Sequence, residues 1–296
     1  MTTRLEAHGK RNSIKRTTQG AAPGWRAIMD VRIQSAEPRF GGVLFRRLHE
    51  LWPAEQWLNA SSPMLMAHGW PEPMAEAFIA ATPAVEWVAK WLATGAQRRV
   101  LALTDPQYPW LLRQIASPPL VLFVDGAFQD LSALQLAIVG SRQYAPASGA
   151  WLAAQMPALA DAGLVITSGL ARGVDALAHQ AALDCGLPTL AVVGTGPDLV
   201  YPAVNRRLAA RIREQGAIIS ELLPGTPAKP DHFPRRNRII SGLARGVLVL
   251  AAAERSGSLI TAQQAADQGR DVFAVPGCIR ITDGYSIIRS LPVYPP

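Results

Sequence analysis

Beyond residue 134 the chain alternates between two hydrophobic patterns. Short continuous apolar runs are separated by segments in which apolar residues recur every three or four positions. Continuous runs are typical of strands buried on both faces, and the three-to-four spacing is typical of the helices that cover them. The pattern therefore predicts an α/β fold, a doubly wound and mostly parallel sheet. The expected strands are 136–139, 165–167, 190–193, 217–220, 247–251 and 272–275, and the expected helices are 150–162, 176–182, 206–214 and 260–268.

The first third of the chain has a different character. From about residue 40 to 98 the apolar spacing is helical, as at Leu44, Leu48 and Leu51, and prolines punctuate the segments. We expect a small helical domain over 36–98 and a second domain over 99–296, with one more strand at 120–124. Residues 1–35 are polar and basic with weak periodicity, so they are predicted to form a disordered lead-in.

Composition narrows the class of protein. Apolar residues make up 49% of the 296, and charged residues 17%, which is enough for a packed core. No apolar run reaches the roughly 18–20 residues that span a bilayer, and no apolar stretch follows the first basic residues. Cys185 and Cys278 are too few for a disulfide framework or a cysteine-rich zinc site. We expect a reduced, cytoplasmic protein that does not insert into membranes.

The positive charge needs a closer look before it indicates a partner. The formal net charge is +7, and the pI of about 9.9 favours an anionic partner such as nucleic acid. Residues 1–20, however, hold five basic side chains and one acidic one. The basic residues are mostly Arg, which suits phosphate contacts, but a GC-rich coding sequence gives the same bias. Net charge alone therefore does not show whether the partner is a nucleic acid.

The ends of the predicted strands carry small residues and arginines. Ligands of open parallel sheets bind outside the carboxyl ends of the strands, where small residues allow close approach and helix N-termini favour anions. Arg142 and Arg172 add charge on two of these loops. Tight turns explain any single glycine, but several such loops with two arginines favour a ligand. Neither a P-loop nor a dinucleotide fingerprint is present, so no nucleotide cofactor is expected. The loops are 140–142, 168–173, 194–196, 220–221, 256–258 and 276–277.

The densest basic run of this region begins after Phe233. It comprises Arg235, Arg236, Asn237 and Arg238. Guanidinium groups suit backbone phosphates, and Phe233 or His232 is available for base stacking, whereas most charge runs are solvated turns. The position of the run between two of the loops favours nucleic acid.

Catalytic candidates are few. Asp175 and His179 are four residues apart and share one helix face, and a structural pair explains them better than catalysis. Glu221 and Glu254 are isolated, and the histidines lack metal-ligand spacing, so neither an enzyme nor a metal site is expected.

Taken in order, the motifs of 108–277 resemble those of the DNA-processing protein A family, also called Smf. The resemblance is carried by Tyr108-Pro109-Trp110, Ile138 to Arg142, Ser168 to Gly173 with Asp175 and His179, Gly194-Thr195-Gly196 with Tyr201-Pro202 and Asn205, Ser220-Glu221, Phe233 to Leu243, Ser256 to Ala262 and Phe273 to Gly277.

The resemblance implies an extended Rossmann-like domain preceded by a helical, SAM-like one. It implies a dimer that binds single-stranded DNA in natural transformation, protects incoming strands and loads the RecA recombinase, with no established catalytic reaction. Matched by motif, the implied DNA contacts are Arg142, Ser168, Gly169, Arg236, Asn237 and Arg238, with Arg172 and Arg235 at more variable positions.

Two departures and two alternatives accompany the resemblance. Ala251 stands where the family usually has Glu, and the closing pattern expected after Gly277 is not visible, so the domain is expected to be shortened at its C-terminus. Similar Rossmann-like folds hydrolyse nucleotide phosphoribosides, but the loop 256–261 has no Glu following within reach. A non-functional or regulatory remnant is the other alternative.

Overall fold

The computed structural model describes residues 60–252 and 256–275. The predicted lead-in at 1–35, the start of the helical region and the expected shortened C-terminus therefore lie outside the described residues.

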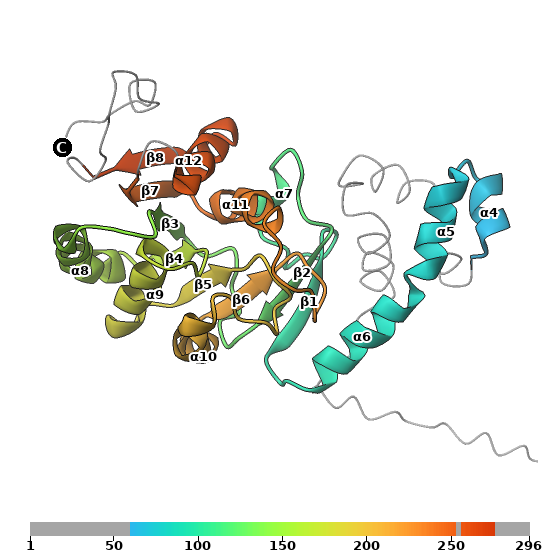
Figure 1. Ribbon diagram of the computed structural model, residues 1–296, viewed down its shortest axis with the longest axis horizontal. Coiled ribbons are helices and arrows are strands. Elements are labelled where there is room, and N and C mark those ends of the chain that lie inside the picture. Colours follow the sequence, from blue (N-terminus) through green and yellow to red (C-terminus); the bar gives the residue numbers. More distant parts are fainter. Residues whose placement is uncertain (1–59, 253–255, 276–296) are drawn as a thin grey trace, which may run out of the picture.

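The described residues form one sheet of eight strands in the order β1-β2-β6-β5-β4-β3-β7-β8 (Figure 1). From β6 to β8 all neighbours are parallel, while β2 pairs antiparallel with both β1 and β6. The prediction of a mostly parallel α/β sheet is confirmed. The strands are β1 (Arg98–Ala102), β2 (Val121–Asp125), β3 (Gln135–Gly140), β4 (Val165–Ser168), β5 (Thr189–Val192), β6 (Ala217–Ser220), β7 (Gly246–Ala251) and β8 (Asp271–Ala274).

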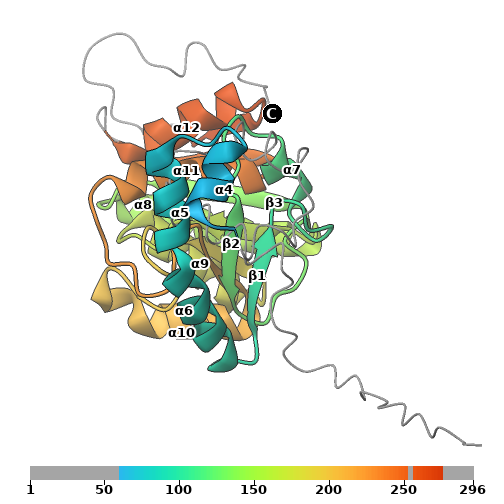
Figure 2. The same cartoon turned by 90° about the vertical axis from the view of Figure 1, so that its right-hand side faces the viewer.

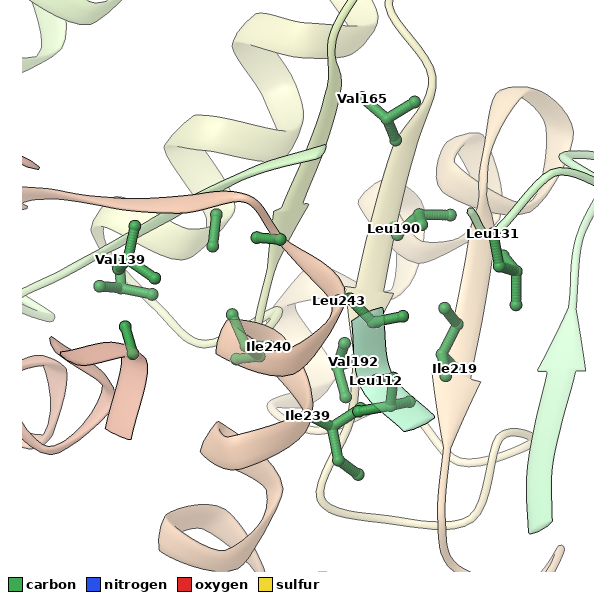
Figure 3. Close-up of a cluster of buried hydrophobic side chains, with 14 of the residues drawn as sticks. Leu112, Leu131, Val139, Val165, Leu190, Val192, Ile219, Ile239, Ile240 and Leu243 are labelled. Atoms are coloured by element: carbon green, nitrogen blue, oxygen red, sulfur yellow. The ribbon is translucent and has the colours of Figure 1, made fainter. Parts of the chain in front are cut away.

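Helices cover both faces of this sheet, as a doubly wound fold requires. On one face α8 (Pro146–Asp161), α9 (Val174–Asp184) and α10 (Arg206–Gln215) pack, and on the other α7 (Trp110–Arg113), α11 (His232–Leu243) and α12 (Gly257–Asp267). A 3₁₀ turn, η1 (Ala203–Asn205), precedes α10. Figure 3 shows Ile239, Ile240 and Leu243 of α11 directed at the sheet, where they share a buried cluster with β5 and β6.

The helical region packs against the antiparallel end of the sheet (Figure 2). Over 60–98, the part of the predicted helical region that the structure describes, it contains α4 (Ser62–Ala67), α5 (Glu72–Ala80) and α6 (Thr82–Ala93). Trp91 of α6 meets Phe123 of β2 edge-to-face, with ring centroids 6.0 Å apart. The preceding β1 was not predicted, and it begins at Arg98, one residue before the expected domain boundary.

The order of the strands places the switch point between β3 and β7. After β3 the chain winds outward through β4, β5 and β6, then returns through α11 to the other side of β3. Ligand crevices in such sheets form at the carboxyl edge near this reversal. No helix in the described part of the chain combines the length and the apolar character needed to cross a membrane.

Candidate nucleic-acid interface

Two loops at the carboxyl edge interlock and bring Arg142 and Arg172 onto neighbouring segments. The amide of Val174 donates to the carbonyl of Ser141 across 3.1 Å. Gly173 has φ +80, and a Cβ there would lie 2.5 Å from the Cα of Arg142, so only glycine allows this approach. Both arginine side chains are exposed. The structure thus gathers the two arginines that the loop pattern singled out.

The loop that carries Arg172 is held in an unusual conformation. Leu170 adopts φ +59 although it is not a glycine, and its side chain is fully buried. Its carbonyl accepts a hydrogen bond of 2.9 Å from the side-chain amide of Asn205, which also reaches the carbonyl of Ala171. Strained backbone of this kind is found mainly at functional sites. Asn205 therefore ties η1 to the arginine loop.

An aromatic pair lies beside these loops. Tyr201, four residues before Asn205, is 53% exposed, and its ring centroid lies 5.5 Å from that of Phe233. Phe233 packs on Gly194, where a Cβ would be 2.9 Å from the ring. Phe233 was an expected stacking residue, whereas Tyr201 was only part of a motif. The feature of the sequence that could have identified Tyr201 as a site residue is its position in the loop after β5, at the same edge as the arginines.

The basic run 235–238 belongs to helix α11, so its arginines point in different directions. Arg235 and Arg238, three residues apart, share a face and both reach the carboxylate of Glu221, with Nη2–Oε1 distances of 2.8 and 2.5 Å. The side chain of Glu221 is 8% exposed, and those of the two arginines 32% and 14%. Two guanidiniums and one carboxylate leave a net charge of +1, less than the sequence indicated.

Arg236 points into the protein. It is 7% exposed, and its Nη1 donates to the carbonyl of Gly169 across 2.7 Å and to that of Val192. Its guanidinium and the carboxyl of Asp175 fill the space beside Gly169, where a Cβ would be 2.6 Å from the Cζ of Arg236 and from Oδ2 of Asp175. The predicted contact residue Arg236 therefore holds the ends of β4 and β5 in place.

Three further predicted contacts have partners within the protein. Ser168 is buried and donates to the carbonyl of Ile138 across 2.6 Å, and Gly169 beside it is buried too. Asn237, half-buried, donates to the carbonyl of Gly257 across 3.4 Å and so links α11 to α12. Direct contact of the Ser168 and Arg236 side chains with DNA would require them to leave these partners. Only Arg142 and Arg172 of the predicted set are exposed side chains.

Asp175 and His179 form part of the buried interior, as the structural interpretation expected. The Thr189 hydroxyl donates to the carbonyl of Ile166, so at 2.7 Å it accepts from Nδ1 of His179. Burial, together with the charge of Arg236, lowers the pKa of His179 to about 3, so the ring is neutral. Burial raises the pKa of Asp175, while Arg236 opposes the rise.

Glu221 and the loop of the enzyme alternative have partners within the protein. Glu221 is held by two arginines, and the Ser256 hydroxyl caps α12 by accepting from the amide of Ser258. Within 60–252 and 256–275, no group of three or more His, Cys, Asp or Glu residues could hold a metal ion. Glu254 lies outside the described residues.

Comparison with known proteins agrees with the motifs. The model of the family described as DNA recombination-mediator protein A matches residues 99–286. The chain is 39% identical over 251 residues to Protein Smf of Escherichia coli, covering 84% of this chain and 66% of that protein. It is 46% identical over 185 residues to DNA processing protein DprA of Streptococcus pneumoniae, covering 62% and 64%. The chain thus spans just under two thirds of the length of these relatives.

Solved structures agree as well. DprA of Streptococcus pneumoniae superposes with a TM-score of 0.66 at 32% identity, over 90% of this chain and 87% of that one. DprA of Helicobacter pylori, studied for its single-stranded DNA binding mode, gives 0.56 at 29% identity, over 61% and 81%. The chain therefore belongs to the DNA recombination-mediator protein A family, the family of DNA-processing protein A and Smf that its motifs resemble.

Proposed function

We propose that this protein binds single-stranded DNA along the carboxyl edge of its sheet. The observation that carries the proposal is the grouping of two exposed arginines, Arg142 and Arg172, with the aromatic pair Tyr201 and Phe233 on loops that are tied to one another. Guanidinium groups bind backbone phosphates, and aromatic rings stack on unpaired bases of any sequence. A duplex hides its base faces, so this combination favours single strands.

The buried residues have a supporting part in this proposal. Arg236, Ser168 and Gly169 fix the loop after β4, so their substitution acts on DNA through the position of Arg172. Arg235 and Arg238 present a charge of +1 together with Glu221 at the same edge. They contribute to the attraction of a polyanion without each acting as a free cation.

The wider role follows from the family. We propose that the protein acts in the cytoplasm as a homodimer during natural transformation, protects incoming strands and loads the RecA recombinase, without catalysing a reaction. Support comes from the family's description as a recombination mediator and from the relatives' names as DNA-processing proteins. A mediator must hold the strand and release it to the recombinase, which reversible phosphate and stacking contacts allow.

Binding measured against salt tests the proposal. Oligonucleotide anisotropy at several ionic strengths is expected to show tighter binding of single than of double strands. Arg142→Ala combined with Arg172→Ala is expected to reduce the slope of log K against log salt by about 1.4, which is about 0.7 for each phosphate that is no longer neutralised. Arg245→Ala is the matched control, because Arg245 is exposed just before β7, at the opposite edge. Equal competition by duplex, or an unchanged slope, would overturn the proposal.

A further inference from the structure

Trp87 of helix α6 presents a large aromatic surface that the core does not use. The residue is 60% exposed, although the neighbouring Trp91 of the same helix is 5% exposed in the core. Its ring rests on the turn at Gly225, where a Cβ would lie 3.1 Å from Cη2 of the indole and closer still to Cζ3. Gly225 has φ +81, so the turn itself requires glycine. The indole is thus positioned by backbone on one side, while most of the residue's surface is exposed.

The turn beneath Trp87 is tied to the loop that carries Tyr201. The amide of Gly225 donates to Oδ1 of Asp198 across 2.8 Å, and the amide of Gly196 donates to the carbonyl of Thr226 across 2.9 Å. From the turn, the chain runs on into α11 and Phe233. Trp87 therefore rests on a turn that is hydrogen-bonded to the loop of Tyr201 and that leads along the chain to Phe233.

Exposed side chains of both signs flank Trp87 and the turn beneath it along the chain, or accept a hydrogen bond from that turn. Lys90 follows one helical turn later and Lys229 lies between the turn and α11, both exposed. Glu86 and Asp198, also exposed, offset them. With two positive and two negative charges on these four side chains, we expect the aromatic surface rather than net charge to supply the affinity here.

We propose that Trp87 stacks on an unpaired base of the strand that is held at the carboxyl edge. The helical region would then extend the interface of the Rossmann-like domain, with one stacking point at Tyr201 and Phe233 and a second at Trp87. This inference rests on the proposed function. Because every base has a π-face, the second point adds affinity without sequence preference.

Stacking and phosphate contact differ in their response to salt, which makes the proposal testable. Trp87→Ala is expected to weaken binding of a long dT oligonucleotide by about 5- to 150-fold, the range for one stacked base, with no change in the salt slope. In a series of dT lengths, the shortest oligonucleotides that bind should be unaffected, because they occupy only the edge loops. Trp87→Phe should keep most of the affinity but lose the part of the DNA-induced tryptophan quenching that Trp87 contributes.

Trp110→Ala is the matched control, since Trp110 is 63% exposed on α7. Its binding should equal that of the unmodified protein, and thermal melts should show that all variants fold. Wild-type affinity of Trp87→Ala for long oligonucleotides, a reduced salt slope, or an equal loss in Trp110→Ala would overturn the inference. If the unmodified protein itself fails to prefer single strands, the proposed function fails instead, and the two failures are distinguishable.

Discussion

At the scale of single residues, the interior holds charged and titratable groups directly behind the candidate interface. Arg236 donates to the carbonyls of Gly169 and Val192 and faces Asp175. Gly169 must lack a side chain because Arg236 and Asp175 already occupy its Cβ position. His179 sits nearby, fully buried, and Arg236 disfavours its protonation. These buried groups thus hold the loop after β4 in place from its inner side.

His179 is expected to make the protein less stable in mild acid. Its pKa is about 3 in the folded protein against an ordinary value of 6.5, so between these values the unfolded chain binds a proton that the folded one does not. The free energy of unfolding should therefore fall by up to about 1.4 kcal/mol per pH unit below 6.5. Denaturant titrations at pH 7.5, 6.0 and 5.0 measure this slope.

His179→Leu is the reference for that measurement, because Thr189 keeps its bond to the Ile166 carbonyl. The variant should lose the acid sensitivity that His179 contributes. Asp175 acts in the opposite sense, because its raised pKa adds stability as pH falls, and it is common to both proteins. If the free energy of unfolding of the two proteins depended on pH in the same way, the acid sensitivity would not come from His179.

At the scale of elements, helix α11 serves two purposes with its two faces. Its inner face, with Ile239, Ile240 and Leu243, packs on the sheet (Figure 3), and Arg236 joins the interior near the start of the helix. Arg235 and Arg238 lie on another face with Glu221 at the end of β6. One short run of basic residues is therefore divided by helical geometry into a structural cation and a partly neutralised pair.

Removing Arg236 is expected to cost far more stability than removing Arg235. Arg236→Met leaves the buried carbonyls of Gly169 and Val192 without their donor, at about 1–3 kcal/mol each, and removes the cation that faces Asp175. Arg235→Gln weakens a pair that is one-third exposed, worth about 0.2–1 kcal/mol. Denaturant unfolding of both variants gives the comparison. A near-equal loss would show that Arg236 does not hold the loops as described.

At the scale of the whole molecule, the helical region and the sheet share a core. Phe123 of β2 is buried in a cluster with Phe78 and Trp91 of the helices, while Leu122 and Val124 face the opposite cluster. Because alternate side chains of β2 point to opposite faces, this strand joins the helical region to the sheet, which the sequence pattern predicts to be separate domains. This shared core also holds Trp87 beside the loops of the Rossmann-like domain.

Phe123→Ala is expected to destabilise both regions together. The cost should be about 3–5 kcal/mol for a buried phenylalanine. Far-UV circular dichroism and tryptophan fluorescence should report one coincident transition, since the two regions unfold as a unit. Phe273→Ala, on β8 at 46% exposure, is the control and should cost less than about 1 kcal/mol. Two separated transitions would contradict a shared core.

The hydrophobic pattern by itself determined the parallel part of the sheet. Runs such as 247–251 are apolar throughout because both faces of the strand are covered, so the pattern can be recognised without knowing which strands pair with it. β1 escaped prediction because it opens with Arg98 and Arg99 and only its last residues are buried. The charges at 235–238 likewise obscured the helical period at the start of α11.

Only the tertiary structure decided which of the conspicuous side chains face water. The sequence predicted eight contact residues at one edge, and folding turned Arg236 and Ser168 inward and paired Arg235 and Arg238 with Glu221. The partners that settle this for the arginines, Gly169, Val192 and Glu221, are 14 to 67 residues away along the chain. Whether a charged side chain can be buried depends on groups that folding brings together from distant parts of the chain. A local sequence pattern therefore does not predict it.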